Sequence, residues 1–136
     1  MRYKNWSRPA SMALAAIVLA MQIGCHKKAP APVTAADVAK AQEEARHEVE
    51  QAQIEAKKDI KSESKIMGSD SAGAARARVT GAFDVAMARA DGDRKVALEK
   101  CMMLEPAAQQ PCKDAAESDY QTAAAKAKAN RASKQP

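Results

Sequence analysis

The side chains most able to carry out chemistry in this 136-residue chain are three cysteines and two histidines. Cys25 follows a glycine near the start of the chain, whereas Cys101 and Cys112 lie close together near its end. A thiol can be acylated, oxidised to a disulfide or bound to a soft metal ion, and an imidazole can act as a base or a metal ligand. The compartment and the elements that carry these residues decide which chemistry applies.

Residues 1–24 have the pattern of a secretory signal peptide. The segment begins with the cations Arg2, Lys4 and Arg8 and continues with an apolar run from Met12 to Ile23. That run is about 12 residues long, whereas a helix that crosses a bilayer needs about 20. The segment therefore predicts export of the chain and not a permanent transmembrane anchor.

Ile23-Gly24-Cys25 resembles the lipobox of bacterial lipoproteins, although Gln22 stands where that family usually has an aliphatic residue. The resemblance implies that Cys25 is acylated and becomes the mature N-terminus. No small-x-small triplet near position 24 favours the alternative, an ordinary cleavage without lipid. His26 follows in place of an aspartate, which by the same resemblance implies an outer-membrane protein that faces the periplasm.

Cys101 and Cys112 are the remaining pair, and an exported protein folds where disulfides persist. Pro106 lies between them and marks a corner between two helices, since proline disfavours helical geometry in the residue before it. An antiparallel helical hairpin places the two cysteines opposite each other. We therefore predict a structural Cys101 to Cys112 disulfide, because the C-x-x-C spacing of redox enzymes is absent.

Metal binding and catalysis are poorly supported by the remaining residues. His47 has carboxylates within a helical turn, and Cys101-Met102-Met103 offers soft sulfur that suits Cu(I). A second histidine is missing near His47, however, and Met103 points away from Cys101 on a helix. Neither histidine accompanies a recognisable nucleophile motif. We expect no catalytic residue, no metal site and no cofactor.

Composition favours long helices over a compact globule. Alanine makes up about a quarter of the chain, and aromatic residues only 3%. Alanine has the highest helix propensity but contributes little by burial. The formal charge is +5, of which three positive charges belong to the signal segment. Acids and bases alternate elsewhere, so we expect no nucleic-acid partner.

Residues 25–33 read as a lipidated N-terminus and a Pro/Ala tether, followed by a long amphipathic helix over 34–67. Thr34 or Asp37 can cap this helix. Its apolar residues recur every 11 positions, a period typical of nearly straight helix pairing; they are Val38, Val49 and Ile60, Ala41 and Ala52, and Ala45 and Ala56. The partner can be the same chain or another copy.

Glycines and small polar residues predict a hinge over 68–73, a helical hairpin over 74–131 and a flexible tail over 132–136. The first hairpin helix has one apolar side, formed by Val79, Phe83, Met87, Ala90, Leu98 and Cys101. Asp91-Gly92-Asp93 weakens this helix, which we expect to stay continuous. The second helix has a poorer apolar face, formed by Cys112, Ala116, Ala123 and Ala127.

The segment from Lys95 to Tyr120 resembles one found in small, uncharacterised envelope proteins of proteobacteria. In these proteins a cysteine pair flanks a short helix corner. The resemblance concerns the layout of about 30 residues and implies a cysteine-paired hairpin, but it transfers no activity.

We therefore expect an all-α envelope lipoprotein with a C-terminal antiparallel hairpin. It is not expected to be an enzyme. It would be anchored to the membrane by lipid and act as a structural or protein-interaction element, through a helical partner or self-association. Two alternatives stay open, a periplasmic binding protein for a metal ion or for an envelope polymer such as peptidoglycan. Peptidoglycan would be contacted by the basic residues near the chain end, which are Lys126, Lys128, Arg131 and Lys134.

Overall fold

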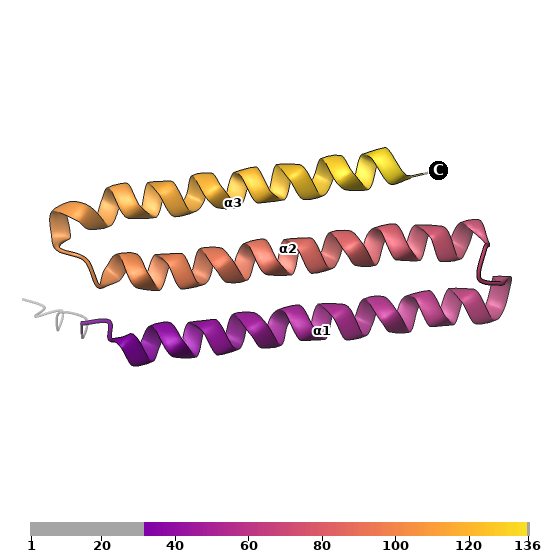
Figure 1. Cartoon of the computed structure of the whole chain (residues 1–136), viewed down its shortest axis with the longest axis horizontal. Helices are drawn as coiled ribbons and strands as arrows, with labels where there is room; N and C mark the ends of the chain where they lie inside the picture. The colour runs from indigo at the N-terminus through magenta and orange to yellow at the C-terminus, as the bar shows by residue number, and fades with distance from the viewer. Residues whose placement is uncertain (1–31, 136) are drawn as a thin grey trace, which may run out of the picture. The chain divides into compact units, whose positions relative to one another are not determined.

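The computed structural model describes residues 32–135, which form three long helices (Figure 1). They are α1 (Ala35–Met67), α2 (Ala72–Met102) and α3 (Pro106–Lys134). The prediction of an all-α chain with a C-terminal antiparallel hairpin is confirmed. No helix in this part of the chain is both long and apolar enough to span a bilayer. The signal segment, Cys25 and the tether up to residue 31 lie outside the described residues.

Helix α1 begins where Thr34 and Asp37 form a reciprocal capping box. The Thr34 backbone amide donates to an Asp37 carboxylate oxygen at 2.8 Å, and the Asp37 amide donates to the Thr34 hydroxyl at 3.4 Å. First-turn amides that lack an intrahelical partner are thereby satisfied. The helix ends at Met67, and its C-cap is Gly68, whose φ of 89° lies in a region that side-chain-bearing residues avoid.

The connection between α1 and α2 is shorter than the hinge predicted over 68–73. Ser71 accepts a hydrogen bond from the Ala74 amide at 3.1 Å, so the helix already begins at Ala72 and contains Gly73. Helix α2 then runs through Asp91-Gly92-Asp93 without a break, as predicted. Gly92 is not a weak point exposed to water, because it is buried in a helix contact.

The corner between α2 and α3 is tight. Pro106 opens α3 in the first helical position, where the missing amide hydrogen costs nothing. The Gln109 side-chain amide donates to the backbone carbonyls of Met102 and Leu104 at 3.4 and 3.0 Å. It therefore satisfies carbonyl groups that the end of α2 leaves without a helical partner.

The three helices form a layer in which α2 lies between α1 and α3 (Figure 1). Within residues 32–135, α1 and α3 make no contact with each other. Consequently α2 buries two opposite sides. Its predicted apolar side contacts α3, while its other side, which includes Gly81 and Gly92, contacts α1.

The α1–α2 contact explains the 11-residue period. A Cβ atom placed on Gly81 would lie 2.5 Å from the Ala56 Cβ, and one on Gly92 would lie 2.7 Å from the Ala45 Cβ. Real Cβ contacts do not approach so closely, so glycine is required at both positions. The alanines of α1 and the glycines of α2 share the same spacing, and α1 therefore pairs with α2 of its own chain.

Candidate functional site

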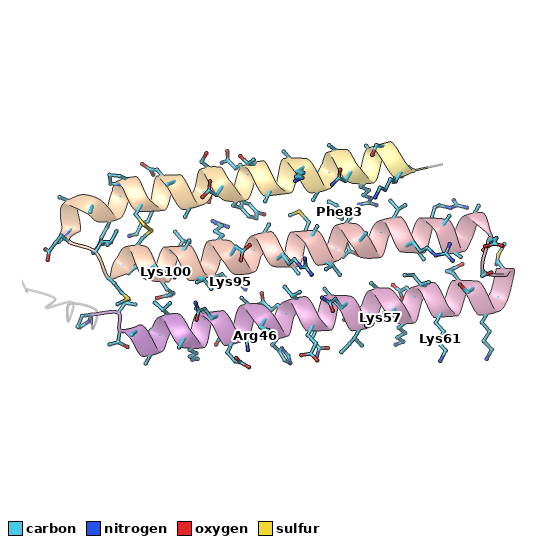
Figure 2. The ribbon with its side chains drawn as sticks, in the orientation of Figure 1. Arg46, Lys57, Lys61, Phe83, Lys95 and Lys100 are labelled. Atoms are coloured by element: carbon cyan, nitrogen blue, oxygen red, sulfur yellow. A yellow bond between two sulfur atoms is a disulfide. The ribbon has the colours of Figure 1, made fainter. Side chains whose placement is uncertain are left out.

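The predicted disulfide is present and joins the last turn of α2 to the start of α3 (Figure 2). The Cα atoms of Cys101 and Cys112 are 5.5 Å apart, within the ordinary range for a disulfide. Cys101 is fully buried and Cys112 is half-buried. Their placement favours a structural link over an exchangeable thiol pair.

This bond holds α3 next to a proline that lies inside the helix. Pro111 lies inside α3 immediately before Cys112, and a proline there removes one helical hydrogen bond. The disulfide also closes a loop with a sequence separation of 11 residues, which reduces the entropy of the unfolded chain. The cysteine pair therefore secures the helix corner.

The candidate metal ligands do not converge. His47 is exposed, and nearby carboxylates of Glu43 and Glu44 form exposed ion pairs with Arg46 and Lys40, at 3.5 and 3.8 Å. Among residues 32–135, no three histidine, cysteine or acidic side chains gather in a metal-binding arrangement. Metal binding thus has no candidate ligand set in this part of the chain.

The basic residues near the chain end differ in their surroundings. The Arg131 guanidinium lies over the Phe83 ring, 4.9 Å from its centroid, so it takes part in the α2–α3 contact. Figure 2 places Phe83 on the α3 side of α2. Lys126 instead lines a groove that includes α1. Arg131 and Lys126 therefore face different surroundings, whereas Lys128 and Lys134 are exposed.

The groove runs over α2, with α1 and α3 as its sides, and has a volume of about 630 Å³. Its surface is mostly apolar and rich in small side chains. Those from α2 include Ala82, Val85 and Ala86, while Ile60 comes from α1 and Ala127 from α3.

Four cations surround the groove, and no acidic residue lines it. They are Lys57 of α1, Arg78 and Arg89 of α2, and Lys126 of α3, and all four are exposed. None forms an ion pair with a carboxylate in the described part of the chain. Arg78 donates to the Ser69 carbonyl at 2.7 Å, which leaves the other three without a hydrogen bond within residues 32–135.

Two ionisable groups elsewhere have shifted pKa values, but both have structural causes. Hydrogen bonds from the backbone and side chain of Thr34 lower the pKa of Asp37 below its ordinary value of 3.8. A hydrogen bond to Glu48, at 2.6 Å, raises the pKa of Lys95 above 10.5. The first shift belongs to the α1 cap and the second to an ion pair across the α1–α2 contact.

Sequence reasoning missed the groove because its residues come from three helices and form no contiguous motif. The apolar face predicted for α3 also left out Ala124, which the structure buries, whereas Ala123, which it included, is exposed and lines the groove. One usable signal was present. Gly81 and Gly92 repeat the spacing of Ala45 and Ala56, which identifies the side of α2 that contacts α1. The sides of α2 that contact neither α1 nor α3 then remain available to form a groove.

Comparisons with known proteins found no match to a protein family, to a curated protein or to a solved structure.

Proposed function

We propose that this chain is a periplasmic lipoprotein, attached to the outer membrane through acylated Cys25, with a structural or protein-interaction role in the cell envelope. The proposed role is non-catalytic. The lipobox-like Ile23-Gly24-Cys25 supports the anchor, and the Cys101–Cys112 disulfide is consistent with an oxidising compartment.

One observation carries the interaction role. The groove over α2 exposes apolar side chains from all three helices next to four cations. An apolar lining flanked by cations that have no carboxylate partner favours the binding of another molecule with complementary charge. The groove is open along its length, which suits a macromolecular segment better than an enclosed small ligand.

The anchor is tested by the intact mass of the protein extracted from membranes, measured before and after reduction and thiol alkylation. We expect a chain that begins at Cys25 and carries the mass of its acyl groups. Two further thiols should become alkylatable only after reduction. A Cys25→Ser variant is the control and should appear in the soluble periplasmic fraction or remain unprocessed. An unacylated wild-type chain would refute the lipoprotein assignment.

A further inference from the structure

We propose that the groove over α2 is the docking site for an acidic amphipathic helix of another envelope protein. This inference deepens the interaction role proposed above and depends on it, but it does not depend on the lipid anchor. It combines three features of the groove: its length along α2, its small apolar lining and its unopposed positive charge.

The length of the groove matches a helical segment. Along α2 it extends from Arg78 to Arg89, which at 1.5 Å per residue corresponds to about 16 Å, or three helical turns. The bordering helices line it over shorter spans, from Gln53 to Ile60 and from Ala123 to Asn130, each about 10 Å. A helix presents anchoring side chains at intervals of three and four residues, so about two or three anchors can enter the groove. The α1 and α3 helices border the groove on either side.

Small side chains allow the incoming helix to approach closely. Ala82 and Ala86 come from α2, and Ala123 and Ala127 come from α3. Alanine leaves space above the helix backbone, which larger side chains of a partner can fill by ridge-into-groove packing. Ile60 and Val85 add larger apolar surface on the α1 side. Leucine-sized anchors therefore suit the groove.

Charge determines the kind of helix. Lys57, Arg78, Arg89 and Lys126 surround the apolar lining, and no carboxylate lines the groove. A partner helix with Glu or Asp on both sides of its apolar stripe would pair with these cations. Such complementarity selects the partner and speeds association more than it adds affinity.

Two other occupants fit this charge poorly. A second copy that used the same groove would bring its own four cations against these four, and like charges at an interface are unfavourable. The chain's own first 31 residues contain five cations and no acidic residue; the cations are Arg2, Lys4, Arg8, Lys27 and Lys28. The occupant is therefore assigned to a different, acidic chain.

The test uses the protein purified from cells and three labelled helical peptides of equal length. The first carries a leucine stripe flanked by Glu, the second the same stripe flanked by Lys, and the third the Glu composition with the stripe scrambled. Fluorescence anisotropy should show binding of the first peptide with a Kd of about 10–100 µM. We expect binding about tenfold weaker for the others, and weaker binding of the first peptide at high salt. Equal binding of the Glu and Lys peptides, or none below 1 mM, would overturn the proposal.

Matched variants locate the binding site. Arg89→Gln with Lys126→Gln removes two groove cations and should weaken binding about fivefold. Lys58→Gln with Lys61→Gln removes two exposed cations of α1 outside the groove and should change the Kd less than about twofold. Figure 2 shows Lys61 on the side of α1 away from α2. Equal effects of the two pairs would contradict docking in the groove.

Ala82→Glu provides an independent check because it places a carboxylate in the groove at an exposed position. We expect it to abolish binding of the Glu peptide while the helical circular dichroism is retained.

Vesicles of pure phosphatidylglycerol test whether the groove instead binds an anionic lipid surface. If vesicles bind through Arg89 and Lys126 and the peptides do not, the groove recognises lipid and the helix proposal fails. The mass measurement of the anchor is unaffected by either result.

Discussion

The two helix contacts of the layer are stabilised in different ways, although α2 takes part in both. Against α1, two glycines of α2 lie directly on Ala45 and Ala56, so the contact depends on close backbone approach. Against α3, the contact uses larger groups, with Arg94 paired to Glu117 at 2.8 Å and lying 5.0 Å from the Tyr120 ring centroid. Only the α2–α3 contact has a covalent link.

The difference shows how an alanine-rich chain replaces a conventional core. Within residues 32–135, the buried apolar side chains are Val38, Cys101 and alanines, and alanine contributes far less burial energy than a Leu or Phe. One side of α2 compensates with many close van der Waals contacts, and the other with a disulfide and stacked arginines. Loss of the disulfide should therefore weaken mainly the α2–α3 contact, and substitution of the glycines mainly the α1–α2 contact.

The largest effect is expected from loss of the disulfide. Cys101→Ala with Cys112→Ala should lower the free energy of unfolding by about 3 kcal/mol, because the unfolded chain regains the entropy of the opened loop. Urea denaturation measures the loss, and hydrogen exchange should show faster opening in α3 than in α1. An equal increase of exchange in all three helices would show that the two contacts are not separable.

The next largest effect tests the glycines. Gly81→Ala should lower the free energy of unfolding by about 1–2 kcal/mol, since the clash with Ala56 exceeds the gain in helix propensity. Gly92→Ala should do the same against Ala45. Thermal denaturation and hydrogen exchange in α1 measure the result.

Gly73→Ala is the matched control in the same helix. A Cβ there would lie 2.7 Å from the flexible Glu63 carboxylate, which can move away, and in ordinary contact with the Ser71 hydroxyl oxygen at 3.8 Å. We therefore expect no loss of stability, or a gain of up to about 1 kcal/mol from helix propensity. If all three substitutions stabilise the protein, the α1–α2 contact is looser than described.

A smaller effect concerns the start of α1. Thr34→Ala removes the N-cap and should lower the free energy of unfolding by about 1 kcal/mol.

Asp37 adds a pH dependence to the stability of the same cap. Because the pKa of Asp37 is lowered in the folded chain, its contribution to the free energy of unfolding is present above pH 3.8 and is lost as the pH falls through the folded pKa. Asp37→Asn should remove this acid-dependent change, and an unchanged acid titration would contradict the capping role.

The smallest effect is expected at the Lys95–Glu48 ion pair across α1 and α2. Both side chains are about half exposed, at 53% and 43%, so Glu48→Gln should cost at most about 0.5 kcal/mol. The raised pKa of Lys95 means that this contribution is present below pH 10.5 and is lost at higher pH. A larger cost would show that the α1–α2 contact depends on charge as well as on close packing.

Sequence reasoning recovered the elements that local chemistry determines. Thr34, Gly68 and Pro106 are helix boundary residues whose physical effects are local, and the cysteine spacing around Pro106 allowed only a narrow range of hairpin geometries. The groove was not predictable in this way. Its lining residues come together only when α1 and α3 have both packed against α2. The angle between these two contact sides around the α2 axis decides which residues of α2 stay exposed, and local sequence does not determine that angle.

Gly92 shows the same limit at one residue. Between two aspartates it suggested a weakened helix, because glycine has a low helix propensity. The structure gives it a packing role that only the position of Ala45 reveals. A glycine inside a long helix is thus ambiguous until its partner helix is known.

The direction of the helices also determines how the layer would respond to force. The start of α1 and the α2–α3 corner lie at one end, and the C-terminus of α3 lies at the other (Figure 1). Tension between these two termini would pull α1 lengthwise along α2, so both glycine–alanine contacts would bear the load together. A sideways pull would instead separate them one after the other. We therefore expect the layer to resist stretching along its helices better than separation across them.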